Sequence, residues 1–452
     1  MVFSQLRNPA FYRKTIHIMI PVMLQQLITV GINFLDNIMV GNFGETQIAA
    51  ASLGNQFYAL FQFVCMGLGS GAIVMAAQYW GAKQTNPLKT VAAIALRLTA
   101  AVSLLFTLAA LIFPGEILHI FTGEDEVVQA GITYLRLVGC TFLLAGISSS
   151  ATYLLRSTGH VKIPLISSIA AFFINLFFNW VFIFGKLGMP RLEIVGAAVG
   201  TVIARAFEFL FIFGYFVLKD TNIGFRLKHF ALSGREILRQ YMKYSLPVLI
   251  SDTLLGIGLS LTSVVIGHVS ATMLAANSIV ASANQLVTIA NTGVAGAASV
   301  VIGNSIGEKE TDRAFQEGTA YCILSLCLGV VFSLILLVLH NPYLTLYSIN
   351  EETIQVARSL FLCIILVSPL QMLSYVTSKG ILRGGGDTRF LLFGDIILLW
   401  AVSLPLGALA GLVWHLSPFW IFFLLKLEYT SKGLICTARF LTKKWIKVIQ
   451  DD

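Results

Sequence analysis

Three aspartates lie inside long apolar stretches of this chain, where an ionisable side chain is costly. They are Asp36, Asp252 and Asp395. A carboxylate in hydrocarbon usually marks an ion or substrate route, because a low-dielectric environment disfavours its charged form. Such a group can take up a proton at neutral pH and release it when water reaches it. The three residues are therefore candidates for binding a coupling ion and a cationic substrate in turn, which is the chemistry of antiport.

Each aspartate also has a structural interpretation. Asp36 could be an interfacial residue close to the end of its apolar stretch. Asp252 could accept a bond from a backbone amide that a nearby proline frees from the helix ladder. Asp395 could form a buried pair with Lys379 or Arg389. The sequence leaves these alternatives open.

Other polar residues carry weaker signals. Arg205 and Glu208 are three residues apart and can pair on one helix face, either as a self-neutralising pair or as part of a binding site. The histidines show no metal-ligand spacing, and His160 and His268 are expected to be hydrated at span ends. No GxxxxGK[ST] motif follows a strand, so we expect no ATP site and no cofactor other than a coupling ion, H+ or Na+.

The elements that carry these residues are predicted from composition. The 452 residues are 57% hydrophobic and only 12% charged, whereas a soluble domain has roughly 25% charged residues. A bilayer-spanning helix needs about 20 apolar residues, and such stretches recur along the chain. We predict an all-α membrane protein with twelve spans, at 16–40, 52–79, 90–113, 130–153, 163–185, 195–218, 242–267, 275–303, 317–339, 355–378, 390–411 and 417–438.

The net charge of +8 is distributed as a topology signal. Most Lys and Arg residues lie in alternate short loops, and the opposite loops hold only Lys186 and Arg191. Cytoplasmic loops carry the excess of basic residues. We therefore predict a multi-pass protein of a prokaryotic plasma membrane with both termini cytoplasmic. The same distribution argues against a nucleic-acid partner.

The chain repeats itself at a separation of 226 residues. The matching pairs include Pro21 with Pro247, Gly41 with Gly267, Gly67 with Gly293, Gly81 with Gly307 and Lys83 with Lys309. Each half has an even number of spans, so the halves are parallel repeats. We predict an N-terminal six-helix bundle at 1–218, a cytoplasmic linker at 219–241, and a C-terminal bundle with a basic tail at 242–452. Two such bundles suit transport by alternating access, and we expect no enzymatic activity.

At several motifs the chain resembles the multidrug and toxic compound extrusion (MATE) family along nearly its whole length. The motifs are IPVMLQQLITVGINFLDNIMVG (Ile20 to Gly41), GLGSGAIVMAAQYWGAK (Gly67 to Lys83), NLFFNWVFIFGKLGMP (Asn175 to Pro190), LPVLISDTLLGIG (Leu246 to Gly258) and LRGGGDTRF (Leu382 to Phe390). The resemblance implies a monomeric antiporter that uses an H+ or Na+ gradient to export bulky, often cationic drugs. The alternative is a lipid-linked oligosaccharide flippase of the same plan, which would need a cationic cavity.

The resemblance also implies site residues. In many prokaryotic members a carboxylate in span 1, matching Asp36, works with an Asn and an Asp one turn apart in span 5. Those two positions are Asn175 and Asn179 here, and a span 6 threonine matches Thr201. The chain departs from the pattern at Asn179, which removes one charge.

Sodium-using members instead have carboxylates in spans 7 and 10, and span 10 here has none. Asp252 and Asp395 resemble positions in a less described bacterial branch. The ion-coupling and substrate-binding candidates are therefore Asp36, Asn175, Asn179, Thr201, Asp252 and Asp395.

Overall fold

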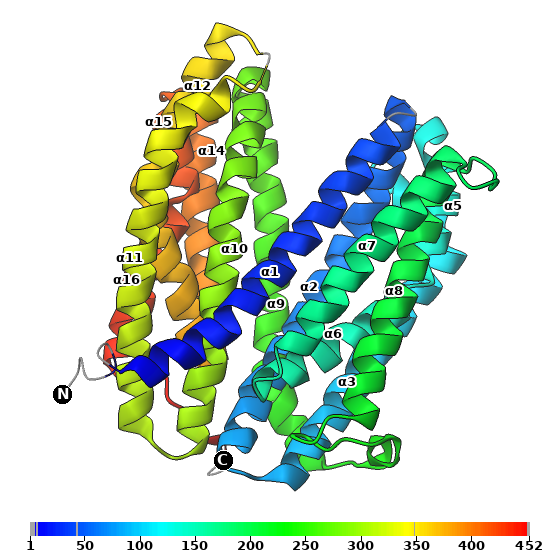
Figure 1. Cartoon of the computed structure of the whole chain (residues 1–452). Coiled ribbons are helices and arrows are strands. Elements are labelled where there is room, and N and C mark those ends of the chain that lie inside the picture. The colour runs from blue at the N-terminus through cyan, green and yellow to red at the C-terminus, as the bar shows by residue number, and fades with distance from the viewer. Residues whose placement is uncertain (1–4, 6–7, 42–43, 348, 450–452) are drawn as a thin grey trace. The chain divides into compact units, whose positions relative to one another are not determined.

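The computed structural model describes residues 5, 8–41, 44–347 and 349–449. All extended regular structure in these residues is helical, and none of them forms a strand (Figure 1). Helices dominate because the apolar segments can satisfy every backbone donor and acceptor internally, which a bilayer requires. The predicted all-α membrane fold is confirmed.

Ten helical runs are long and apolar enough to cross a membrane, and a bent pair makes an eleventh. The N-terminal ones are α1 (Pro9–Gly41), α2 (Glu45–Gly81), α3 (Thr85–Ile112), the pair α5 (Asp125–Gly139) and α6 (Phe142–Ser157), α7 (Lys162–Phe184) and α8 (Glu193–Leu218). The C-terminal ones are α9 (Arg235–Val269), α10 (Ala271–Gly307), α11 (Thr311–Leu344), α12 (Glu351–Tyr375) with η3 (Val376–Leu382), and α13 (Thr388–Asp395) with η4 (Ile396–Ser403) and α14 (Leu404–Leu412).

The twelfth predicted span is covered by two shorter helices, α15 (Pro418–Leu425) and α16 (Leu427–Leu441), interrupted at Lys426. Two minor elements, α4 (Pro114–His119) and the 3-10 helix η2 (Leu227–Ala231), complete the helices of the described residues. With the bent pair as one span, the helices form two six-helix lobes, in agreement with the predicted fold class.

The internal repeat is visible in the helix boundaries. Helices α2 and α10 begin at Glu45 and Ala271 and end at Gly81 and Gly307, in each case 226 residues apart. The starts of α1 and α9, of α3 and α11, of α5 and α12, and of α7 and α13 have the same separation. Lys83 and Lys309, which follow α2 and α10, both have positive φ, 58° and 61°. The two halves therefore share one helical plan.

The contacts divide the chain into two compact units, and each division falls inside a helix. The N-terminal unit is Leu24–Leu249, and the C-terminal unit is the described chain up to Met23 and from Ile250 onward. The first part of α1 belongs to the C-terminal unit because Thr15 Oγ1 hydrogen-bonds Tyr321 OH at 2.8 Å. The start of α9 belongs to the N-terminal unit, where Tyr241 OH donates to the Leu68 carbonyl at 2.7 Å. The predicted domain boundaries at 218 and 242 stay a prediction.

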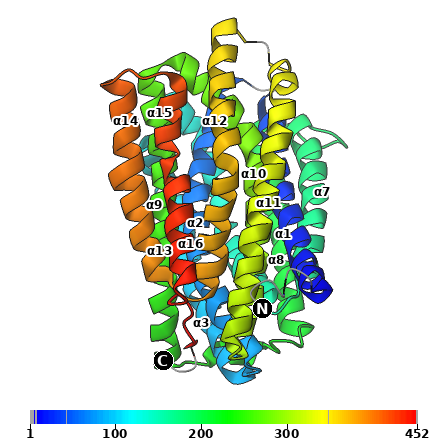
Figure 2. The ribbon, with the colours of Figure 1, turned by 90° about the vertical axis from the view of Figure 1, so that its left-hand side faces the viewer.

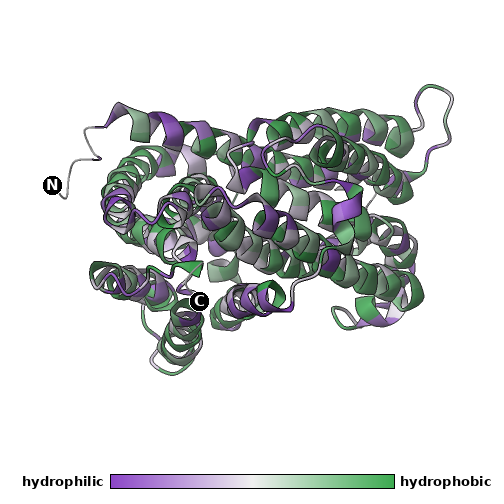
Figure 3. Cartoon of the chain, turned by 90° about the horizontal axis from the view of Figure 1, so that it is seen from below, coloured by the Kyte–Doolittle hydropathy of each residue, from purple (hydrophilic) through white to green (hydrophobic). Residues whose placement is uncertain are grey.

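Each unit has its own apolar core and an apolar outside. In the N-terminal unit the rings of Phe61 and Phe142 stack at 5.0 Å, and in the C-terminal unit Phe361 and Phe422 are buried. Large hydrophobic side chains such as Phe173 are nevertheless exposed. Figure 3 shows hydrophobic residues over most of the helices. An apolar outer surface on helices of this length is typical of contact with lipid.

The segment predicted as a linker, 219–241, is folded onto the N-terminal unit. Its Asp220 carboxylate is buried and accepts hydrogen bonds from the backbone N–H groups of Ile223 and Gly224. His160, which the sequence suggested to be simply hydrated, lies 2.9 Å from Asp220 through Nδ1. That expectation was wrong, because the segment brings a carboxylate back to the end of α6 from 60 residues away.

Two π-helical segments interrupt spans of the C-terminal unit, η3 after α12 and η4 between α13 and α14. Figure 2 shows the run of α13 and α14 beside the run of α15 and α16 in this unit. A π-helical turn is rare and is frequently found at functional sites, since it re-aims side chains around the helix. Both segments adjoin charged residues that are buried in this unit.

Candidate functional site

The first polar cluster lies in the N-terminal unit and joins α1, α7 and α8. Helix α7 is almost wholly apolar, and its Asn175 and Asn179 are four residues apart, which places both on the same face. Both side chains are buried. Asp36 lies near the end of α1, and Thr201 lies in the third turn of α8. The helices therefore supply four polar groups to one place.

These four groups form a chain of hydrogen bonds. Asn179 Nδ2 donates to Asp36 Oδ1 at 2.5 Å and to Asn175 Oδ1 at 3.2 Å. Asn175 Nδ2 donates to Thr201 Oγ1 at 3.5 Å. Because both partners of Asn179 Nδ2 are acceptors, its amide orientation is fixed. The predicted residues Asp36, Asn175, Asn179 and Thr201 are thus brought together.

The side-chain amide oxygen of Asn179, Oδ1, makes no hydrogen bond within the described structure although the residue is fully buried. It faces Gly200 of α8, where an added Cβ would lie 2.1 Å from this oxygen. Only a glycine at residue 200 leaves room for Asn179 between the two helices. A buried acceptor without a donor is unfavourable and calls for an explanation such as a ligand ion.

A pocket opens beside this cluster, entirely within the N-terminal unit. Its lining includes Asp36, Asn175 and Thr201 together with polar and aromatic groups of α2, α5, α8 and the turn before α6. Those additional groups are Asn55, Tyr58, Tyr134, Thr141, Arg205 and Glu208. Such a mixture of an acid, amides and aromatic rings is suited to an organic cation.

Two interactions organise the far side of this pocket. Arg205 Nη1 donates to Glu208 Oε2 at 2.7 Å, and the guanidinium lies 5.5 Å from the centre of the Tyr58 ring. Tyr134 OH donates to Asn55 Oδ1 at 3.3 Å. The i,i+3 pairing of Arg205 and Glu208 is as expected from their spacing. Sequence reasoning did not place the pair beside Asp36, since that depends on the rotation of α8 against α1.

The second polar cluster lies in the C-terminal unit around Asp252 of α9. Arg383 binds this carboxylate with two parallel hydrogen bonds, Nη1 to Oδ2 at 3.1 Å and Nη2 to Oδ1 at 3.0 Å. Lys379 Nζ lies 3.1 Å from the same Oδ1. Lys379 is part of η3 and Arg383 follows it, so the π-helical segment presents both cations to one carboxylate.

Asp395, the residue before η4, lies next to this cluster. It forms an ion pair with Lys432 of α16 and accepts a hydrogen bond from Ser251, the neighbour of Asp252 in α9. Asp395 and Lys432 are both buried. The pairing partner differs from Lys379 and Arg389, the cations considered from the sequence. Burying the two charges together limits the cost of placing either in the unit.

The six candidate residues are therefore divided between two clusters in different units. Asp36 lines a pocket and accepts a hydrogen bond from an amide, whereas Asp252 and Asp395 are paired with cations. The sequence interpretation considered Lys379 as a partner of Asp395 but not of Asp252, and it did not consider Arg383 or Lys432 as partners of either acid. The four-residue spacing of Lys379 and Arg383 was the available signal for a shared carboxylate.

Among the described residues, no group of three or more His, Cys, Asp and Glu side chains could hold a metal ion. The donors around Asp36 are instead one carboxylate and neutral oxygens of amides and a hydroxyl. Oxygen donors of this kind suit a proton or a hard monovalent cation.

The fold and the two clusters define a class, a polytopic α-helical membrane protein with two repeated lobes and buried polar sites. The family model described as MatE matches residues 21–181 and 247–423, and the chain belongs to this family. The two matched segments begin 226 residues apart, the separation of the internal repeat. The predicted family membership is confirmed.

Relatives cover nearly the whole chain. It is 21% identical over 429 residues to "Uncharacterized transporter YisQ" of Bacillus subtilis, covering 94% of this chain and 93% of the relative. It is 26% identical over 414 residues to "Probable multidrug resistance protein NorM" of Halalkalibacterium halodurans, covering 89% of each. A solved structure described as the outward-facing conformation of a multidrug resistance MATE family transporter matches with a TM-score of 0.86 at 18% identity, over 98% of each chain.

Proposed function

We propose that this protein is a cation-coupled antiporter that exports bulky, often cationic organic compounds, with H+ or Na+ as the coupling ion. The observation that carries this proposal is the Asp36 carboxylate, which lines a pocket and is held by Asn179 rather than by a cation. An acid that is not bound to a fixed cation is available to mobile ones. The multidrug resistance names of several relatives support drugs as the substrates.

The exchange follows from competition for one negative site. With Asp36 ionised, an organic cation can bind in the pocket against the carboxylate and the aromatic rings of Tyr58 and Tyr134. When H+ or Na+ neutralises Asp36, the attraction is lost and the cation leaves. A ligand can shift the conformational equilibrium only if its affinity differs between the inward-open and outward-open states. We propose alternating access on this basis.

For Na+, the oxygen donors that line the pocket at this cluster are the Asp36 carboxylate, the Asn175 amide and the Thr201 hydroxyl. For H+, Asp36 alone is sufficient. The two ions make different demands on Asn175 and Thr201, so the coupling ion can be decided by experiment.

The flippase alternative requires a cationic cavity for a diphosphate. The charged groups that line the pocket are Asp36, Arg205 and Glu208, and the single cation among them is already paired with Glu208. This charge balance favours a cationic substrate. We further propose that the protein acts as a monomer in the plasma membrane and moves its substrates without chemical change.

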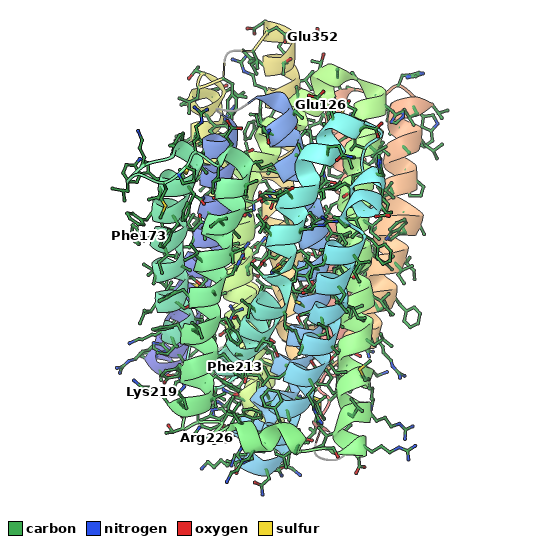
Figure 4. The ribbon with its side chains drawn as sticks, turned by 90° about the vertical axis from the view of Figure 1, so that its right-hand side faces the viewer. Glu126, Phe173, Phe213, Lys219, Arg226 and Glu352 are labelled. Atoms are coloured by element: carbon green, nitrogen blue, oxygen red, sulfur yellow. The ribbon has the colours of Figure 1, made fainter. Side chains whose placement is uncertain are left out.

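The ends of the N-terminal unit support the proposed orientation. Figure 4 shows Glu126 near one end of its helices and Lys219 and Arg226 at the opposite end. Basic residues are retained on the cytoplasmic side of a membrane. The end that carries Lys219 and Arg226 is therefore proposed to be cytoplasmic, with both termini on that side.

The test is efflux of a cationic dye from everted membrane vesicles under an imposed H+ or Na+ gradient. We compare the wild type with Asp36→Asn and with Asp125→Asn, the same change at a side chain that is 90% exposed. We expect gradient-driven transport in the wild type and in Asp125→Asn and its loss in Asp36→Asn. Transport that survives Asp36→Asn would move the coupling site to Asp252 and Asp395. Wild-type vesicles that move no cationic dye under either gradient would overturn the proposed function.

A further inference from the structure

The pocket beside Asp36 contains a second acid and a cation, Glu208 and Arg205, that the exchange described above does not use. Both residues line the pocket from α8, and they form an ion pair at 2.7 Å. Their side chains are 26% and 16% exposed, so neither is freely hydrated. An unpaired charge that is buried to this extent is costly. In the Arg205–Glu208 pair each charge neutralises the other, which limits this cost.

The position of Arg205 is fixed from two sides. Its guanidinium stacks against the Tyr58 ring at 5.5 Å in addition to pairing with Glu208. Tyr58 is in turn held by a hydrogen bond from Gln62 Nε2 to its hydroxyl. A planar guanidinium with an acid on one side and a ring on another loses little conformational freedom. The pair is therefore a stable part of the pocket wall.

The charge of the pocket can be counted from its lining. The titratable groups that line the pocket with Asp36 are Tyr58 of α2, Tyr134 of α5, and Arg205 and Glu208 of α8, whereas the side chains that α7 contributes are all neutral. Tyrosine is neutral near pH 7. With Asp36 ionised the pocket has one net negative charge, and with Asp36 neutralised it has none. With Asp36 neutralised, the net charge of the pocket lining is zero only because the charge of Arg205 cancels that of Glu208.

We propose that Arg205 is the residue that makes the pocket switchable, by keeping Glu208 neutralised so that Asp36 alone decides whether an organic cation binds. The inference rests on the proposed function. It explains why a second acid in the pocket does not prevent the release of the substrate when Asp36 is neutralised. Without Arg205, Glu208 would hold a cation even after Asp36 had taken up its ion. The substrate would then bind but would not be released.

The experiment measures binding of ethidium, a monovalent aromatic cation, to the purified full-length protein. Asp36→Asn serves as a permanent mimic of the neutralised acid. We expect ethidium to bind the wild type and to bind D36N at least about tenfold more weakly, a change that one charge at pocket distances can produce. The double variant D36N/R205Q exposes Glu208 and should regain most of this affinity. The triple variant D36N/R205Q/E208Q should lose it again.

A charge-conserving control separates charge from a general disturbance of the pocket. D36N/R205K keeps a cation beside Glu208 and should stay as weak as D36N. The inference is overturned if D36N/R205Q stays weak while the wild type binds and D36N does not. It is also overturned if D36N/R205K regains affinity as D36N/R205Q does, because charge would then not be the cause.

The proposed function fails in a different way. Cation exchange at Asp36 is excluded if the wild type binds no ethidium, or if D36N binds ethidium as well as the wild type does. This inference would then fail together with the proposed function. Elution as a single species in size-exclusion chromatography confirms that each variant is folded. If D36N/R205Q fails this check, D36N/R205M, which also removes the charge of Arg205 and keeps Glu208, takes its place, with D36N/R205M/E208Q as the matching triple variant.

Discussion

Gly200 is the residue on which the geometry of the Asp36 cluster depends most directly. It lies on α8 where that helix passes Asn179, and the space that a side chain would occupy is taken by the Asn179 carbonyl oxygen. Because Asn179 is the group that holds Asp36, a change at residue 200 acts on the acid through the amide. The position illustrates how a residue without a side chain can determine the geometry of a polar site.

We predict that Gly200→Ala destabilises the protein by about 1–3 kcal/mol, the usual cost of overpacking, and displaces Asn179 from Asp36. The matched control is Gly214→Ala on the same helix, where an added Cβ meets no atom within 4 Å. Thermal unfolding of the purified variants and dye transport should both separate them. Equal behaviour of the two variants would show that the contact at residue 200 can relax without consequence.

For Asp252 we predict a large effect of substitution on the stability of the protein. It is buried against Arg383 and Lys379 and is their shared anion. Asp252→Asn leaves the buried Arg383 and the partly buried Lys379 without their acid, so we predict a loss of about 3–5 kcal/mol in stability. Asp312→Asn, which removes an exposed partner of Lys443, should cost no more than about 1 kcal/mol. A fully stable D252N that no longer transports would instead assign Asp252 to the coupling mechanism.

At the scale of elements, the 219–234 segment behaves as a folded part of the N-terminal unit. The backbone N–H of Arg226 donates to His229 Nδ1 at 2.9 Å, which requires that this nitrogen carry no proton. Partial burial, with the positive charges of Lys89, Lys228 and Arg226, lowers the pKa of His229 below its ordinary value. Protonation therefore opposes the folded form of η2.

The pH dependence follows from the sign of this shift. A base with a lowered pKa in the folded state contributes stability that is present above its unfolded value of about 6.5 and is lost as pH falls below it. We predict that amide hydrogen exchange in 221–231, corrected for its intrinsic pH dependence, is faster at pH 5.5 than at pH 7.5. His229→Gln should remove this difference and His119→Gln, at a half-exposed histidine, should not. An unchanged difference in His229→Gln would assign the effect to another group.

The same segment shows what element prediction missed. Charge and length identified 219–241 as a basic linker, but Asp220, Phe225 and Tyr241 are buried. Phe225 stacks against Phe216 of α8 at 5.4 Å. A connection between repeats can look hydrophilic overall and still contribute a few buried side chains that tie it to one unit. The net charge of a segment does not reveal such buried side chains.

At the scale of the whole molecule, the helical repeat and the basic loops together predict one orientation in the membrane. In a variant without the six native cysteines, a cysteine at residue 125 and another at residue 221 mark opposite ends of the N-terminal unit. We predict that a membrane-impermeant maleimide labels Asp125→Cys in intact cells and labels Thr221→Cys only after the cells are opened. The reverse pattern would invert the proposed topology.

The two lobes share helix boundaries but not their polar sites. The N-terminal unit places an acid in a pocket beside an ion pair, while the C-terminal unit pairs each candidate acid directly with cations. A duplicated scaffold explains the common helices, and divergence after duplication can leave each half with its own charges. We expect the two units to have different tasks, with exchange in the first and structural ion pairing in the second.

The sequence alone determined the properties that arise from local patterns. Apolar stretches of sufficient length fixed the helical spans, residues at a 226-residue separation revealed the repeat, and ordered motifs identified the family. The spacing of Asn175 and Asn179 also placed both on one helix face, since that is a property of the helix itself. These features need no knowledge of how helices pack.

Only the tertiary structure decided which charges meet. Asn179 reaches Asp36 across 143 positions in the chain, and Arg383 reaches Asp252 across 131. Such pairs depend on the rotation and depth of each helix against its neighbours. A helix that is apolar nearly all round carries little periodicity from which its rotation could be predicted. The sequence therefore identified the acidic residues, and the packing of the helices determined which residues they pair with.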